Sequence, residues 1–233
     1  MRVLLACCGL LAAGLVGQSA DAPVLPVVHR PADVVHQGVP GPVPVPAAAP
    51  AAPPSAPPGR VVQRGTGRLN RVPGTSAVAG TGPLQTYEVL VEGGIGIDGP
   101  AFVAAVERVL ADPRSWTAGG RRSLQRVDAA ADLRIVLASP DTTDDLCAPL
   151  RTVGRLSCGS GRTAVLNARR WLTGAPAYAG RLDAYRTYLV NHEVGHTLGR
   201  GHAGCPGRGR PAPVMMQQTL TVGRCRPSAW PFP

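Results

Sequence analysis

The sequence of 233 residues contains no lysine and few aromatic residues. All 24 basic side chains are therefore arginine, against 14 acidic ones, and the formal net charge is +10. Nucleic-acid-binding surfaces cluster basic side chains and interleave them with aromatic rings that stack on bases. Here the arginines are scattered and aromatic residues make up only 4% of the chain. We therefore expect no nucleic acid among the partners.

The N-terminal hydrophobic run is too short to cross a bilayer comfortably. Residues 3–16 are apolar and follow Met1-Arg2, whereas a transmembrane helix needs ~20 residues. This arrangement is typical of a secretory signal peptide, which we place over residues 1–22. An uncleaved anchor is the alternative, and it would be the expected contact with a membrane.

Proline and alanine dominate the next part of the chain. Residues 41–58 are almost wholly Pro, Ala and Val, a composition that favours extended polyproline II and cannot form a packed core. A basic, glycine-bearing stretch follows over residues 60–71. We expect a disordered linker over residues 23–82, or a cleavable pro-segment, and then one monomeric folded domain over residues 83–233.

Hydrophobic periodicity predicts the elements of that domain. Residues 86–92 alternate and indicate a strand, and residues 122–127, 131–138 and 163–168 are interpreted as further strands. Asp98 can cap a helix that ends at Asp112-Pro113, and a second helix covers residues 182–198. The first helix carries an apolar face made of Phe102, Val103, Val106, Val109 and Leu110.

These elements predict an α+β fold. Its mixed sheet would contain about four to five strands, with two main helices and an irregular C-terminal part. Residues 94–99 match G-x-G-x-x-G, but Asp98 would place a carboxylate where a pyrophosphate needs bare amides, and Pro100 removes an amide. We interpret this stretch as a turn and expect no dinucleotide cofactor.

Cysteines provide a further prediction. Cys7 and Cys8 would leave with the signal peptide, and no C-x-x-C spacing supports a zinc site made of four cysteines. Four cysteines outside the cell indicate two disulfides, for which three connectivities exist. The shortest loops favour Cys147 with Cys158 and Cys205 with Cys225.

The clearest chemical signal is the motif H-E-x-x-H-x-x-G-x-x-H, which begins at His192. On a helix that turns ~100° per residue, His192 and His196 share one face and can both bind one Zn²⁺ at roughly 2.0–2.1 Å. Gly199 can adopt φ > 0 and end the helix, so that His202 returns as the third ligand. Glu193 can take a proton from water on the metal. Three protein ligands leave a fourth position open, as in catalytic zinc sites.

Together with residues 213–217, this motif resembles the metzincin metallopeptidases, in which a methionine turn forms an apolar floor beneath three zinc-binding histidines. The resemblance implies a metzincin-like fold, the same three histidines as ligands and Glu193 as catalytic acid and base. Met215 is the expected turn methionine, and Met216 is the second choice. Some metzincins carry a tyrosine two residues after this methionine, whereas Gln217 stands here. The residue that stabilises an oxyanion therefore stays open.

Most of residues 82–233 is also similar to a family of secreted actinobacterial proteins labelled a domain of unknown function. The similarity is carried by residues 112–116, 131–140 and 166–171 and by the zinc motif through residue 219. It implies a bacterial protein that is secreted or held at the cell surface.

We therefore expect a zinc-dependent peptidase that acts on protein or peptide substrates, with cell-wall peptide cross-links as a related substrate. A non-catalytic, zinc-stabilised binding module at the cell surface is the alternative. Gln217 leaves room for the module, whereas Glu193 counts against it because a structural zinc site has no use for a base.

Overall fold

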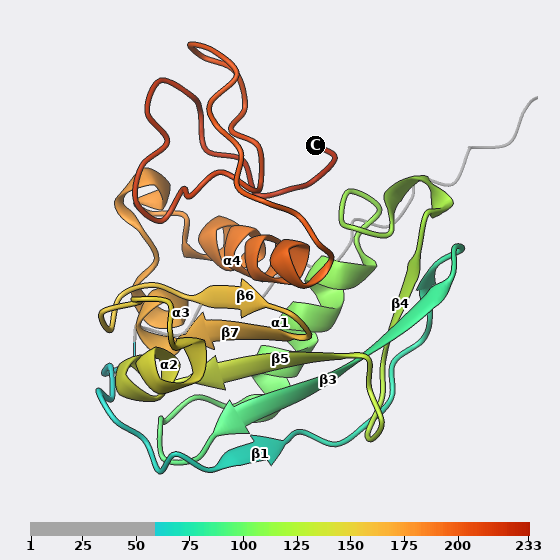
Figure 1. Cartoon of the computed structure of the whole chain (residues 1–233), viewed down its shortest axis with the longest axis vertical. Coiled ribbons are helices and arrows are strands. Elements are labelled where there is room, and N and C mark those ends of the chain that lie inside the picture. Colours follow the sequence, from blue (N-terminus) through green and yellow to red (C-terminus); the bar gives the residue numbers. More distant parts are fainter. Residues whose placement is uncertain (1–58) are drawn as a thin grey trace, which may run out of the picture. The chain divides into compact units, whose positions relative to one another are not determined.

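The computed structural model describes residues 59–233, which form a seven-stranded mixed sheet with helices on both faces (Figure 1). The strand order is β2-β4-β3-β5-β7-β6, and β1 pairs with β3 beside this path. The central strands β4, β3, β5 and β7 are parallel, whereas β1, β2 and β6 run antiparallel to their neighbours. The elements are β1 (Leu69–Arg71), β2 (Ala79–Gly80), β3 (Leu84–Glu92), α1 (Gly99–Ala111), β4 (Ser123–Arg126), β5 (Leu133–Ala138), α2 (Pro140–Cys147), β6 (Cys158–Ser160), β7 (Thr163–Asn167), α3 (Ala168–Thr173) and α4 (Leu182–Thr197).

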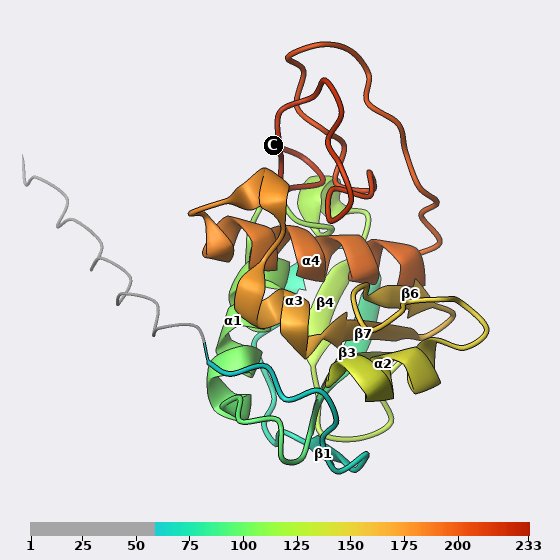
Figure 2. The same ribbon diagram turned by 90° about the vertical axis from the view of Figure 1, so that its left-hand side faces the viewer.

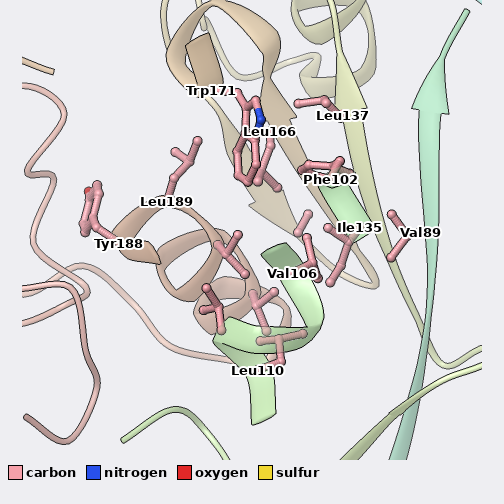
Figure 3. Close-up of a cluster of buried hydrophobic side chains, with 14 of the residues drawn as sticks. Val89, Phe102, Val106, Leu110, Ile135, Leu137, Leu166, Trp171, Tyr188 and Leu189 are labelled. Carbon is pink, nitrogen blue, oxygen red and sulfur yellow. The ribbon is translucent and has the colours of Figure 1, made fainter. Parts of the chain in front are cut away.

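Alternating side chains of the central strands divide the core into two layers. Val89, Ile135 and Leu166 belong to the larger layer, where Figure 3 shows them facing the side chains of α1 and α4. Their neighbours Val136 and Val165 point to the opposite face, where α2 and the disulfide between Cys147 and Cys158 cover them. Burial of a parallel sheet on both faces explains why apolar side chains predominate in β5 and β7.

The two long helices lie where the sequence predicts them. In α1 the Asp98 carboxylate accepts a hydrogen bond from the Ala101 N–H at 2.6 Å, and all five residues of the predicted apolar face are buried. In α4, which crosses the sheet above β6 and β7 in Figure 2, Leu189, Val190 and Val194 are buried, and Leu182 and Leu198 are partly buried. The helix therefore places residues 192–196 over one end of the sheet.

The folded part begins earlier than expected, so the prediction of a linker as far as residue 82 is wrong for residues 59–82. Strand β1 pairs with the end of β3, and β2 pairs with β4. The buried Glu92 carboxylate fixes this segment because it accepts hydrogen bonds from Gly67 N–H at 2.8 Å, Ser139 N–H at 2.7 Å and the Thr142 hydroxyl at 2.8 Å. Strands of two or three residues are too short to show a periodicity. The predicted signal peptide and residues 23–58 of the linker lie outside the described residues.

The fold class is confirmed as α+β with a mixed sheet, but the numbers of elements were underestimated. The described part contains seven strands, and the short helices α2 and α3 join the two long ones. None of the helices in residues 59–233 combines the length and apolar character that a membrane span requires.

Candidate metal centre

The three motif histidines converge on one point, as their spacing predicts. His192 and His196 lie on one face of α4, and their potential ligand atoms and that of His202 all lie within 4.8 Å of one another. The Nε2 atoms of His196 and His202 are 3.1 Å apart. Two nitrogens bound tetrahedrally to one zinc at 2.0–2.1 Å would be separated by roughly 3.3 Å, so this spacing fits a shared ion.

Gly199 produces the turn that brings back the third histidine. Its φ is 77°, in the left-handed region that an L side chain adopts only at a cost. The helix ends there with two hydrogen bonds, from Gly199 N–H to His196 O at 3.0 Å and from Arg200 N–H to Gly195 O at 2.9 Å. The chain then leaves the helix axis in an irregular segment that carries His202, as predicted.

Backbone carbonyls orient two of the imidazoles. His192 Nδ1 lies 2.8 Å from Val214 O, and His196 Nδ1 lies 2.8 Å from Arg200 O. A carbonyl only accepts, so each Nδ1 carries the proton, and Nε2 is left with the lone pair that a metal needs. Burial lowers the pKa of His192 to about 4, which also favours a neutral ring. A set of three imidazole ligands with one coordination position left for another group suits zinc.

Glu193 lies beside the histidines in a buried position. Its side chain is 5% exposed and lines the pocket described below, without a hydrogen-bond partner among residues 59–233. Burial raises the pKa of this carboxyl group to about 8. A divalent cation at the three nitrogens would favour the ionised form and lower that pKa again. The arrangement therefore places a titratable carboxyl group in the pocket that the three histidines line.

A turn beneath the helix contains Met215. Met216 N–H donates to Pro213 O at 2.9 Å, and Met215 is buried within this turn. A Cβ atom added to Gly195 would lie only 2.4 Å from the Met215 sulfur, so the sulfur packs directly against the helix between His192 and His196. The backbone carbonyl of Met215 also accepts from Ala203 N–H at 3.0 Å. The turn thus contacts the helix and the segment of the third histidine.

A pocket of about 240 Å³ opens onto the histidines and Glu193. One wall is made of residues 150–152 and 156–159, which belong to the loop closed by a disulfide between Cys147 and Cys158. The other wall is made of Gln217, Thr219 and Leu220. A second disulfide joins Cys205 to Cys225 beyond the third histidine. Both pairings are those that the short loops favour, and disulfides indicate an oxidising compartment outside the cytoplasm.

The family model described as "Protein of unknown function (DUF3152)" matches residues 56–227. The chain belongs to this family. No curated protein and no solved structure matches it. The match includes residues 59–82, in agreement with their place in the sheet. The family description names no activity, so the function has to be inferred from the site.

Several residues that support the site were not foreseen. Asn191 is fully buried next to His192, where its amide donates to Ala229 O at 3.0 Å and accepts from the Ser115 hydroxyl at 2.8 Å. Trp116 Nε1–H donates to the Asn191 carbonyl at 2.9 Å. These contacts join α4 to the segment after α1 and to the C-terminal tail. A single asparagine in a helix carries no sequence signal for such a role.

Gly159 is another residue that sequence reasoning missed. It lies in β6, and a Cβ atom there would be 2.3 Å from Glu193 O and 2.7 Å from the Cβ atom of His196. Only glycine lets the edge strand approach the helix so closely. The glycine therefore sets the distance between the pocket wall and the residues of α4 that line the pocket.

Proposed function

We propose that this protein is a zinc-dependent peptidase of the metzincin type, exported from a bacterial cell or held at its surface. One observation carries the proposal: three imidazoles converge and line one open pocket together with the buried carboxyl group of Glu193. A closed structural zinc site has four protein ligands. Met215, which packs against α4 at Gly195, is the residue that the metzincin resemblance assigns to the methionine turn.

Zinc, when bound, supplies a Lewis acid that polarises a carbonyl group and makes a water molecule more acidic. His192, His196 and His202 would hold it, and the carbonyls of Val214 and Arg200 keep two of these rings in the required tautomer.

Glu193 would move the proton. Its carboxylate takes a proton from the attacking water and later gives it to the nitrogen of the leaving amine. Because the group is buried and has no hydrogen-bond partner within the described part of the chain, its basicity is not reduced by a competing donor. Tyr188 also lines the pocket, but its hydroxyl already donates to Met216 O at 3.0 Å and accepts from Gln218 N–H at 2.9 Å. It therefore serves the framework of the site, and the exposed Gln217 amide is the freer donor for an oxyanion.

The substrate would bind in an extended form along β6. This strand is the last in the sheet order and pairs with β7 on one side only. Cys158 and Gly159 of β6 line the pocket, so a peptide that pairs with the open edge would pass across the metal site. Such binding uses the main chain and would be compatible with protein substrates and with wall peptides.

The test is Glu193→Gln in the full chain, with Glu107→Gln as a matched control. Glu107 pairs with Arg126 far from the pocket, and the same change is made there. We expect Glu193→Gln to keep one zinc per chain by metal analysis and to lose hydrolysis of casein, a peptide library or isolated cell wall. Glu107→Gln should stay active. Unimpaired turnover by the Glu193 variant would refute the role of this residue.

The absence of a tyrosine at residue 217 favours one alternative, a zinc-stabilised binding module without turnover. Wild-type protein with zinc that leaves all three substrates intact would support the module. Products that disappear when a chelator is added would support the peptidase.

A further inference from the structure

A second pocket, of about 330 Å³, lies on the other side of the disulfide-closed loop. We call it the arginine pocket, because Arg155 of the loop and Arg169 and Arg170 of α3 line it, together with Gln63 and Thr173. It shares no lining residue with the pocket at the histidines. In Figure 2 helix α3 lies below α4 and beside β7, so the arginine pocket lies on the α3 side of α4.

The arginine pocket has three cations and no carboxylate among its lining residues. Two acidic side chains contact residues of the pocket lining, and both are already hydrogen-bonded. Asp141 accepts from Gln63 at 2.5 Å and pairs with Arg64 at 3.1 Å, and Asp144 accepts from Gly154 N–H at 2.8 Å. Like charges gathered in one concave place repel one another unless an anion joins them. The composition of the pocket therefore favours an anionic ligand.

Arg169 carries a donor without a partner. Its Nη2 donates to Gln63 Oε1 at 2.9 Å, but its Nε atom, which is shielded from solvent, has no hydrogen-bond partner among residues 59–233. Buried polar groups in proteins are nearly always paired, so such a donor calls for an acceptor. The guanidinium fork of arginine matches the oxygens of a phosphate or carboxylate group.

Two further contacts prepare the pocket. Arg170 is held in place because Nε donates to Arg155 O and Nη1 donates to Gly174 O at 3.2 Å. The buried Asn167 side chain donates to Leu156 O at 3.2 Å, and the Cys147–Cys158 bond closes the loop. The loop and α3 are thus joined before any ligand arrives, which reduces the entropy lost on binding.

We propose that the arginine pocket binds a phosphate group, either free or as a phosphodiester of an anionic polymer outside the cell. Arg169 Nε, the Arg155 guanidinium and the remaining Nη2 of Arg170 would donate to its oxygens. Three cations match the charge of a phosphate better than that of a single carboxylate. The proposal does not depend on the peptidase function, because it concerns other residues.

The test compares the full chain with Arg155→Ala/Arg169→Ala and with Arg68→Ala/Arg224→Ala. The second double variant loses the same two charges at exposed sites whose side chains make no hydrogen bond or ion pair within the described residues. Calorimetric titration with inorganic phosphate should show saturable binding by wild type, a tenfold or larger loss of affinity in the pocket variant, and no change in the control. Equal affinity in all three proteins, equal losses in both variants, or no saturable binding of any phosphate probe would overturn the proposal. If phosphate binds at the three histidines instead, all three proteins should bind it with equal affinity, which would overturn the proposal.

Two polymer probes identify the source of the group. Binding of poly(glycerol phosphate) that depends on the two arginines, without binding of free phosphate, would assign the pocket to a phosphodiester. Poly-glutamate that competes as well as the phosphate polymer would overturn the assignment to phosphate. Thermal unfolding checks that each variant is folded, and Arg155→Gln, a change of an exposed side chain, replaces the double variant if that one does not fold.

Discussion

Substitution of Gly159 by alanine tests whether the close approach of β6 to α4 positions the site. The added Cβ atom would lie 2.3 Å from Glu193 O and 2.7 Å from the His196 Cβ atom, whereas ordinary contacts begin at 3.4 Å. These atoms are backbone or close to it, so they cannot turn aside as the end of a flexible side chain would. Strand and helix would have to separate by about 1 Å.

The expected magnitude follows from two opposing effects. Overpacking of a buried contact costs about 1–3 kcal/mol. Replacing glycine by alanine restricts the unfolded chain, which offsets about 0.4–1 kcal/mol. We therefore expect a net loss of about 1–2 kcal/mol in the free energy of unfolding. The effect on catalysis should be larger, because a shift of ~1 Å in groups that act together can reduce a rate ~100-fold.

Urea denaturation measures the stability, competition with a chromogenic chelator measures zinc affinity, and peptide hydrolysis measures the rate. Gly204→Ala is the matched control, since a Cβ atom at Gly204 meets no atom within 4 Å and the change in the unfolded chain is the same. Wild-type stability, zinc affinity and rate in Gly159→Ala would contradict the idea that this glycine sets the spacing.

Two further predictions concern the support of the site and the metal itself. Gln218→Ala should lower the free energy of unfolding by about 2–4 kcal/mol in urea denaturation. The reason is that this fully buried amide accepts a hydrogen bond from the Tyr178 hydroxyl at 2.9 Å and donates one to Ser228 O at 2.7 Å. Gln217→Ala at the exposed neighbour should change the free energy of unfolding by less than about 0.5 kcal/mol. Equal effects of the two changes would count against this role. Removal of zinc by a chelator should lower the melting temperature by about 8–16 °C if the ion is present at ~1,000 times its dissociation constant. In His202→Ala the chelator should no longer change the melting temperature. If the chelator does not change the melting temperature of the wild-type protein either, no ion is bound.

Long, periodic segments were predictable because their local pattern and their final environment agree. Helices α1 and α4 bury the apolar residues that their periodicity selects. Strand β3 buries Tyr87, Val89 and Val91 on one face, but it also buries Glu88 and Glu92 on the other, which its alternation did not predict. Helices α2 and α3 contain eight and six residues, too few turns for a clear period. Strands β1 and β2 contain three and two residues, and they form because they pair with β3 and β4.

The same distinction applies to the metal centre. The spacing of His192 and His196 on α4 and the turn at Gly199 that returns His202 are both encoded in the motif, so the motif was sufficient to predict the convergence. The carbonyl of Val214, the amide of Asn191 and the missing side chain of Gly159 act across elements that are distant in the chain. Their roles arise from tertiary packing, which no local pattern reports.

Trp116 lies close enough to the histidines for its fluorescence to respond to a bound ion. Its ring lies against the helix backbone at Gly195, between the two helical histidines, and its indole N–H is tied to the carbonyl of the residue before His192. A change in the field around those histidines reaches this indole directly, whereas Trp171 lies in the core layer against Phe102. Occupancy by an ion would thus be readable in the ultraviolet emission of the unlabelled protein.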